Sequence, residues 1–342
     1  MYRPTIYDLA KEAGVSLSTV DRVLNRRSGV RETTIKRVYD AVERIGYVRD
    51  VTAANLARQK SHRFVFVLPD AKDAIISNIN EAIIEAQTRA AAERIDLNVI
   101  YVPAGDPYAL VEKLHELEDT NANGVAIMAP ETPQVRDAIK HLKENDVNVV
   151  AIVSDLPNSE RDHFAGIDNI AAGRTAAELM GRFIGEKPSK IMVLTDSMLA
   201  RDNAERRLGF DQIMEEEFPY LKVLPSIEGR NDDELVAKLT EEIFKKYSDI
   251  SGVYSLGAGN AGLIKVLQKL EIATTTTIIT HELTEQAKKA LEYRIYDAVI
   301  GQDFGHVVRS AIRMLRSKNE DIAYLPSQEK ISIDIFIKEN II

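Results

Sequence analysis

Along the first sixty residues, apolar side chains recur at the three- and four-residue spacing of short amphipathic helices. Gly14 allows a tight turn after the first run, and Ser16 stands where an N-cap belongs, so a second helix is predicted to begin near Leu17. Three short helices with one shared core form a helix-turn-helix unit. The expected core positions are Ile6, Leu9, Ala10, Ala13, Val20, Val23, Leu24, Ile35, Val38, Tyr39, Val42 and Ile45.

From Phe64 onward, short apolar runs alternate with amphipathic helical segments. This alternation predicts parallel strands joined by crossover helices, and the number of runs suits two doubly wound units. The strand-like runs are FVFVL, LNVIYV, GVAIMA, VNVVAIV, KIMVLT, LKVLPS, GVYSL, TTIIT and DAVIG. The last residues, ISIDIFIKENII, are also strand-like and carry no leucine heptads, so we expect no tetramer by that route.

The net charge of −9 is unevenly distributed along the 342 residues. Residues 1–60 hold 12 Lys and Arg against 7 Asp and Glu, which gives +5 and leaves −14 for the remainder. Because an acidic surface is repelled by phosphates, the basic head is the part expected to meet a polyanion. Chance clustering of solvated charges is the alternative explanation.

Several function classes are disfavoured by composition. The chain has no cysteine, which excludes disulfides, thiolate metal sites and a cysteine nucleophile and suits a reducing cytoplasm. No secretory signal and no run of membrane-spanning length is found, so we expect a cytoplasmic protein that meets no membrane. No Gly-x-Gly-x-x-Gly or Walker A sequence follows a strand, and GAGNAG lacks a lysine and an acidic partner. We therefore expect no cofactor and no metal.

The second helix has an outward face that its core does not need. Hydroxyl and amide groups beside a helix N-terminus suit phosphate oxygens, and Arg22 can reach two acceptors on a guanine edge. The face therefore suits a DNA major groove, although an ordinary capped surface helix explains any one of these residues singly. The expected outward residues are Leu17, Ser18, Asp21, Arg22 and Asn25.

The segment TIYDLAKEAGVSLSTVDRVLN, followed by ERIGYVRD and VTAANLARQ, resembles the head of the LacI/GalR family of transcriptional regulators. The resemblance implies that the second helix reads the major groove and that a hinge helix inserts Leu56 into the minor groove. Asp21 departs from the family's usual serine, which alters the expected operator preference. The residues expected to bind DNA are Thr5, Ser16, Leu17, Ser18, Thr19, Asp21, Arg22, Asn25, Ala53 and Leu56.

The hinge can also be interpreted from physical principles. Asp50 can cap a helix from Val51 to about Arg58, but these few residues fall below the roughly 12 to 15 at which an isolated helix is marginal. Small residues such as Ala53 let two such helices pack closely, with Leu56 as an apolar wedge at a flexible base step. Hinge folding and DNA bending would then be one event, whereas a plain helical linker is the alternative.

The remainder, including SDLPNSERDHFAGIDNIAAGRTAAELM and DAVIGQD, resembles the periplasmic-binding-protein-like core of the same family. The resemblance implies an α/β fold, a type I core with two lobes of doubly wound parallel sheets, preceded by the all-α helix-turn-helix domain. We expect a DNA-binding domain over 1–49, a hinge helix and linker over 50–60, and an effector-binding and dimerisation domain over 61–342. The first lobe would hold about 62–165 and 298–328, and the second about 166–297.

A ligand in such a fold binds between the lobes, at the carboxyl ends of strands. Asp155, Glu282 and Gln302 each follow a strand-like run, Arg206 lies in AERRLGF, and each matches a ligand-contact position of the family. Carboxylates that accept hydrogen bonds and an arginine that donates them suit the neighbouring hydroxyls of a polyol. A small sugar or sugar-like effector is therefore expected.

The loop after the first strand completes the expected effector site. It offers Ile75 and Ile76 where sugar binders of this fold often place aromatic rings, which weakens stacking on a sugar face. Tyr254 or Phe304 is the candidate replacement for those rings.

The order of these motifs predicts a homodimeric transcriptional regulator of repressor type that binds palindromic operator DNA and a carbohydrate or polyol effector. The effector either releases or strengthens DNA binding. The alternative is the same regulator controlled by a protein partner. A glycosidase using Asp155 and Glu282 lacks any accompanying nucleophile or metal constellation, and neither it nor a sugar-transport protein needs the head. We therefore predict that the chain is not an enzyme and has no catalytic residues.

Overall fold

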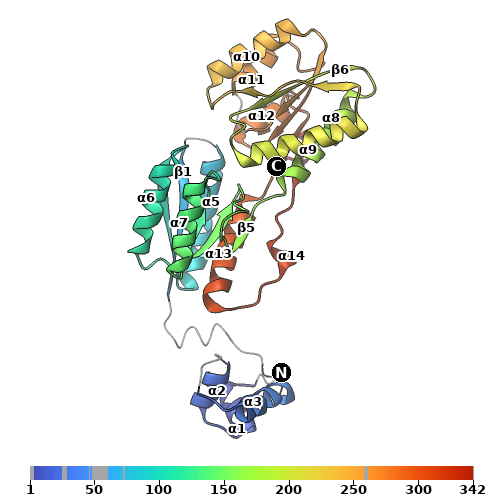
Figure 1. Cartoon of the computed structure of the whole chain (residues 1–342). Helices are drawn as coiled ribbons and strands as arrows, with labels where there is room; N and C mark the ends of the chain where they lie inside the picture. The colour runs from blue at the N-terminus through green and yellow to red at the C-terminus, as the bar shows by residue number, and fades with distance from the viewer. Residues whose placement is uncertain are drawn as a thin grey trace. The chain divides into compact units, whose positions relative to one another are not determined.

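The computed structural model describes residues 4–24, 29–45, 47, 61–71, 74–257 and 261–341 (Figure 1). The chain divides into two compact units, Met1–Lys60 and Ser61–Ile342. Asn25, Ala53 and Leu56, with the expected hinge helix, lie outside the described residues. Within the described ranges, no helix is long and apolar enough to cross a lipid bilayer.

The head folds as three helices, α1 (Ile6–Ala13), α2 (Leu17–Leu24) and α3 (Glu32–Ile45). Thr5 and Asp8 form a capping box at the start of α1, in which each side chain accepts from the other's backbone N–H. Gly14 then takes the left-handed conformation (φ 61°) that ends the helix. The predicted succession of helices and the start of α2 at Leu17 are confirmed.

One small core joins the three helices. The prediction that Tyr39 belongs to it is wrong, because the Tyr39 side chain is 44% exposed and Ala41 is fully buried instead. Val38, Ala41 and Ile45 keep the helical spacing, whereas Tyr39 lies one position, about 100°, past Val38. The buried members are Leu9, Ala10, Ala13, Val20, Val23, Val38 and Ala41.

The first sheet of the body has five parallel strands in the order β2-β1-β3-β4-β5. Alternate residues of its strands face opposite sides, so Phe64 and Phe66 pack toward α5 and α13 while Val65 and Val67 pack toward α6 and α7. The elements are β1 (His62–Asp70), α5 (Ala74–Ala92), β2 (Ile95–Pro103), α6 (Pro107–Glu118), β3 (Gly124–Ile127), α7 (Pro133–Glu144), β4 (Asn148–Ile152), β5 (His163–Ala165) and α13 (Phe304–Glu320).

The second sheet has the order β12-β11-β10-β9-β6-β7, with β8 also paired to β6. Its two faces are covered in the same way, by α8 and α9 on one side and by α10, α11 and α12 on the other. The elements are α8 (Asn169–Ile184), β6 (Ser189–Thr195), α9 (Arg201–Glu217), β7 (Leu221–Val223), β8 (Ile227–Glu228), α10 (Asp233–Lys246), β9 (Ile250–Ser255), α11 (Ala261–Lys269), β10 (Thr277–His281), α12 (Glu285–Glu292), β11 (Ala298–Gly301), β12 (Asp334–Phe336) and the 3₁₀ turn Lys338–Asn340. The short helix α14 (Pro326–Glu329) instead bonds to α13, where Ser310 Oγ donates to Glu329 Oε2 at 2.6 Å.

The prediction that residues 298–328 all belong to the first lobe is wrong at its start. β11 pairs with β10 in the second sheet, Ala298 opposite Ile279, and β12 adds antiparallel on the other side. A strand that follows β10 through a single crossover helix joins the same sheet, so the chain leaves that sheet only after Gly301. α13 then packs against α5 and β4 of the first sheet.

The helices α8 and α9 approach each other backbone to backbone (Figure 1). A Cβ at Gly173 would lie 1.9 Å from the Arg206 carbonyl oxygen, and a Cβ at Gly209 would lie 2.0 Å from the Ile170 carbonyl oxygen. Only glycine permits this approach at either position. The contact holds the start of α8, at Asn169, beside Arg206 of α9.

We expect Gly173→Ala to lower the free energy of unfolding by about 2 kcal/mol or more, because the new methyl group forces the two helices apart. Urea denaturation of the full chain measures the loss. Gly305→Ala is the matched control, since the nearest atoms to its Cβ belong to the side chains of Arg309 and Asp303 and not to a neighbouring backbone. Equal losses in the two variants would contradict the tight α8–α9 contact.

Candidate functional site

The start of α2 gathers three hydroxyl groups on the surface of the head. Ser16 Oγ accepts from the Thr19 N–H at 3.2 Å and lies 2.8 Å from Ser18 Oγ and 2.9 Å from Thr19 Oγ1. The first turn of a helix also presents unpaired N–H groups at the positive end of its dipole. This end of α2 therefore suits a phosphate oxygen.

The described residues that were predicted to face outward on α2 all reach solvent, in full or in part. Leu17, Ser18 and Arg22 are exposed, and Asp21 is half-buried. Thr5 is occupied as a cap, since its hydroxyl donates to Asp8 Oδ2 at 2.7 Å. DNA contact by these residues stays a prediction.

Three of the predicted ligand residues converge in one buried network of the body. The Arg206 guanidinium donates to Asn169 Oδ1 at 2.9 Å, to the Leu256 carbonyl at 2.8 Å and to Glu282 Oε1 at 3.2 Å. Gln302 Nε2 donates to the same Glu282 oxygen at 3.2 Å. Arg206, Glu282 and Gln302 are only 2%, 1% and 7% exposed. The carboxyl ends of β9 and β10 thus meet at one arginine of α9, and the end of β11 joins them through Glu282.

Glu282 is held in an unusual backbone conformation directly after β10. Its φ of 67° lies in the left-handed region, which costs a non-glycine residue about 1–2 kcal/mol. Burial raises the pKa of its carboxyl group, against the opposing effect of Arg206. Among the described residues, neither Glu282 Oε2 nor Gln302 Oε1 has a hydrogen-bond partner. Two buried acceptors without donors indicate a place for a donor-bearing molecule.

The predicted ligand residue of the first lobe, Asp155, lies apart from that network. It follows β4 and Val153, whose φ of 65° is again left-handed, a rarity for a β-branched residue that is concentrated at binding sites. Arg161 donates two hydrogen bonds to Asp155, from Nη2 to Oδ2 at 2.7 Å and from Nε to Oδ1. Asp155 lines a pocket of about 510 Å³ together with Asn169, the residue that also accepts from Arg206.

The pocket contains side chains that the sequence did not single out. Phe164, Glu205 and Tyr324 line it, and the Tyr324 ring meets the His163 ring edge-on at 6.4 Å between centroids. Phe164 lies on a strand of only three residues, too short for its alternation to be recognised. Tyr324 comes from the connection after α13, so only the fold brings it here. Asn169 gave a weak signal as a polar residue at the start of a helix.

The apolar residues expected at the cleft mostly serve the core. Ile76 is buried, and Ile75 is partly buried against the same cluster. Tyr254 stacks on Phe210 at 4.3 Å between centroids, and its hydroxyl lies 2.8 Å from His281 Nε2. Tyr254 and Phe304 are both buried, and stacking of a ligand on either ring stays a prediction.

One ion pair joins the two lobes. Arg201, at the start of α9, contacts the carboxylate of Glu131, which follows β3 in the first lobe. Glu131 is in turn held by Asn158 Nδ2 at 2.6 Å, and Arg201 Nε lies 2.7 Å from Glu205 Oε1. We name the Arg201–Glu131 pair the interlobe ion pair. The sequence gave no signal for it, because its partners are 70 residues apart.

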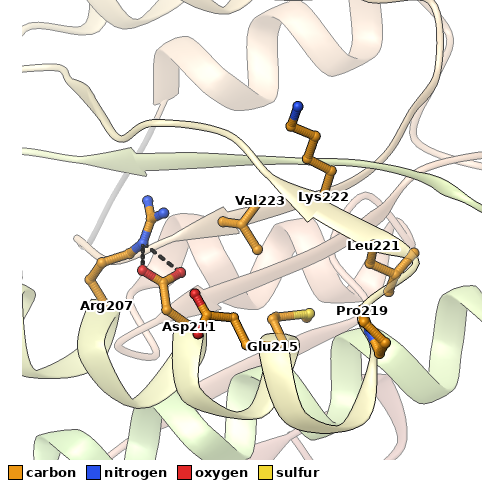
Figure 2. Close-up of a pocket in the computed structure, with 8 residues that line it drawn as sticks. Arg207, Asp211, Glu215, Pro219, Leu221, Lys222 and Val223 are labelled. Atoms are coloured by element: carbon orange, nitrogen blue, oxygen red, sulfur yellow. Dashed lines mark hydrogen bonds and ion pairs between the residues drawn. The ribbon is translucent and has the colours of Figure 1, made fainter.

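The neighbouring Arg207 lies beside a different pocket, of about 320 Å³, between α9 and β7 (Figure 2). Its Nε lies 2.8 and 2.7 Å from the two carboxylate oxygens of Asp211, one turn along the helix. Its Nη1 donates to the Leu224 carbonyl at 3.2 Å and to Ser226 Oγ at 2.8 Å. These contacts tie α9 to the segment after β7, so Arg207 has a structural role that contrasts with that of Arg206.

Comparison with known families decides what the two units are. Residues 64–320 match the periplasmic binding protein domain, and residues 5–50 match the bacterial regulatory proteins of the lacI family. The chain belongs to the periplasmic binding protein domain family and carries a lacI-family head. The α/β fold and the helix-turn-helix head expected from the sequence are thereby confirmed.

The proteins to which this chain is similar include regulators. It is 31% identical over 153 residues to catabolite control protein A of Priestia megaterium, covering 44% of this chain and 43% of that protein. It is 25% identical over 215 residues to the HTH-type transcriptional regulator DegA of Bacillus subtilis, covering 63% and 61%. The chain thus spans about half the length of the curated relatives that it matches.

Among solved structures, the glucose-galactose binding protein GanP of Geobacillus stearothermophilus has a similar fold. The TM-score is 0.73 at 19% identity, over 82% of this chain and 99% of that one. The likeness concerns the fold alone.

The buried His281 of the periplasmic-binding-protein-like body predicts a pH dependence of stability. Burial, with a smaller effect of Arg206, lowers the pKa of His281 well below its ordinary 6.5. As pH falls below about 6.5, His281 becomes protonated in the unfolded chain but not in the folded chain. The free energy of unfolding therefore falls with pH below that value. One such group contributes at most about 1.4 kcal/mol per pH unit.

We expect His281→Gln, which keeps a partner for the Tyr254 hydroxyl and cannot titrate, to flatten this decline between pH 7 and 5.5. Urea denaturation at several pH values measures it. The same substitution at exposed His115 is the control. Parallel pH profiles of His281→Gln and the unaltered chain would rule out this role for His281.

Proposed function

We propose that this chain is a sequence-specific DNA-binding transcriptional regulator of the LacI type, and a repressor, whose operator affinity is set by a sugar or sugar-like effector. One observation carries the proposal. A lacI-family head with hydroxyls and Arg22 exposed on α2 is joined, in one chain, to a body in which Arg206, Glu282 and Gln302 converge. A protein that only transported or hydrolysed sugars would have no use for such a head.

On DNA, α2 enters the major groove. The hydroxyls and first-turn N–H groups hold phosphates and fix the register, while Arg22 donates to the edge of a guanine. Because one head makes few contacts, two copies of the chain bind a palindrome whose half-sites lie about 34–36 Å apart. A homodimer, acting in the cytoplasm where bacterial operators are found, is therefore part of the proposal.

The effector binds in the body, among Asp155, Asn169, Arg206, Glu282 and Gln302. The name of the structurally similar GanP refers to glucose and galactose, which supports a sugar. Control by a protein partner is not favoured, because the converging polar groups are buried in the body instead of exposed on its surface.

Effector and operator are coupled through the arrangement of the lobes. A ligand changes operator affinity only by the difference between its affinities for two arrangements, typically worth about 1–3 kcal/mol. The interlobe ion pair stabilises the arrangement in which Arg201 and Glu131 meet. The effector acts on the same equilibrium when it binds residues of both lobes.

We expect Arg22→Ala to weaken binding to the preferred operator by about 5- to 150-fold, equivalent to about 1–3 kcal/mol, because a base contact is lost. The operator is first selected from random DNA with the purified chain, and affinity is measured by fluorescence anisotropy. Arg44→Ala is the control, since Arg44 pairs with Glu12 at 2.7 Å on another helix of the head.

Two results would count against the DNA-binding proposal. If Arg22→Ala weakens selected and random DNA equally, Arg22 contacts phosphate and reads no base. If the unaltered chain selects no sequence at all, the proposed function itself fails.

We also expect Glu131→Ala and Arg201→Ala each to weaken sugar binding by about two- to five-fold, the range of partly exposed ion pairs. The double variant should lose less than the sum of the two single losses, because each single variant already removes the interlobe ion pair. Calorimetry with whichever of glucose and galactose binds more tightly measures the effect. Additive losses would show that the two residues act independently, and the exposed pair Lys269–Glu241 serves as the control.

A further inference from the structure

We propose that the body selects an uncharged, hydroxyl-rich effector and rejects its phosphorylated or carboxylated counterparts. This inference rests on the proposed sugar-responsive function and narrows it to one chemical class. Four features carry it: unpartnered acceptors, an arginine already engaged, an acidic pocket wall, and aromatic rings on that wall.

The unpartnered groups in the buried network are acceptors. Among the described residues, Glu282 Oε2 and Gln302 Oε1 are buried and accept no hydrogen bond. A buried acceptor is stabilised only when a donor reaches it. Sugar hydroxyls supply such donors, whereas the oxygens of a phosphate or carboxylate at neutral pH are chiefly further acceptors.

The arginine that would otherwise hold an anion is already engaged. Arg206 donates through Nε, Nη1 and Nη2 to Asn169, Leu256 and Glu282. Asp202 Oδ2 also lies 4.0 Å from Arg206 Nη1, so a second carboxylate shares this positive charge. An incoming phosphate would have to share this one positive charge with Glu282 and Asp202, whose carboxylates repel it.

The wall of the adjoining pocket carries more carboxylates than cationic side chains. Asp155, Asp168, Glu205 and Glu329 line it, whereas Lys330 is its one cationic side chain among the described residues. Asp155 is paired with Arg161, Glu205 with Arg201 and Glu329 with Arg313, so these arginines are also occupied. His163 adds no charge at neutral pH, because burial lowers its pKa.

Aromatic side chains complete the pocket wall. Phe164 and Tyr324 both line the cavity, whose volume of about 510 Å³ is in the range of small-molecule sites. The faces of aromatic rings offer apolar surface to the C–H groups of a neutral sugar, and their negative quadrupole repels an anion placed over them. The recognition chemistry is therefore that of an unmodified sugar or sugar alcohol.

The test compares matched pairs on the full-length chain: glucose with glucose 6-phosphate, and galactose with galactose 6-phosphate. Binding is measured by calorimetry at neutral pH, and binding of the selected operator is followed in parallel with each compound. We expect at least one free sugar to bind and to change operator affinity. We expect its phosphate to bind at least 100-fold more weakly.

Two variants of α9 distinguish an effect of pocket charge on ligand binding from a general effect of altering this helix. Glu205→Gln removes one carboxylate from the pocket wall with little change in shape. We expect this variant to reduce, by several-fold, the gap between the affinity for the free sugar and the affinity for its phosphate. Asp211→Asn, beside the other pocket, is the matched control and should leave the gap unchanged (Figure 2). An unchanged gap in Glu205→Gln, or an equal change in both variants, would overturn the electrostatic argument.

The outcomes distinguish this inference from the proposed function. If a phosphorylated sugar binds as well as its parent or better and changes operator affinity, the selectivity inference is overturned while the sugar-controlled regulator stands. If none of the four compounds binds although the chain still selects an operator, the inference is overturned and the DNA-binding part of the proposed function alone remains.

Discussion

The close approach of α8 and α9 is the constraint on which the ligand site depends. Gly173 and Gly209 leave room for the backbone of each helix to touch the other, at distances that any side chain would prevent. This contact brings the N-terminus of α8, with Asn169, against the guanidinium of Arg206. Arg206 in turn reaches the ends of β9 and β10, so two helices in backbone contact at these glycines fix the centre of the site.

Stability alone does not explain the hydrogen-bonded network around Arg206. Transferring Arg206 and Glu282 from water into the interior costs several kcal/mol per ion, and the hydrogen bonds between them only partly offset that cost. Unpartnered atoms on Glu282 and Gln302 and left-handed backbone at Val153 and Glu282 add further unfavourable terms. Local violations of this kind, gathered where strands end, are typical of sites preserved for binding.

The two units of the chain meet different chemical demands. The head needs little core, because three short helices close on seven buried side chains, and its basic surface suits phosphates. The body is acidic and large, and its two sheets are covered by helices on both faces, which leaves the strand ends as the natural place for a ligand. The interlobe ion pair links the two sheets by charge, so the geometry of one lobe is sensitive to the other.

The sequence by itself determined the local elements. Helical spacing located α1, α2 and α3, short apolar runs located the main strands, and strand ends pointed to Glu282 and Gln302, because each of these signals lies within a few consecutive residues. The resemblance to a known family added Arg206 to them. Tertiary structure alone decided that Tyr39 is exposed, that β11 joins the second sheet, that Asn169 connects Arg206 to the pocket, and that Arg201 meets Glu131. Those outcomes depend on contacts between segments far apart in the chain. The side-chain pattern within one segment does not specify which distant segments it will contact.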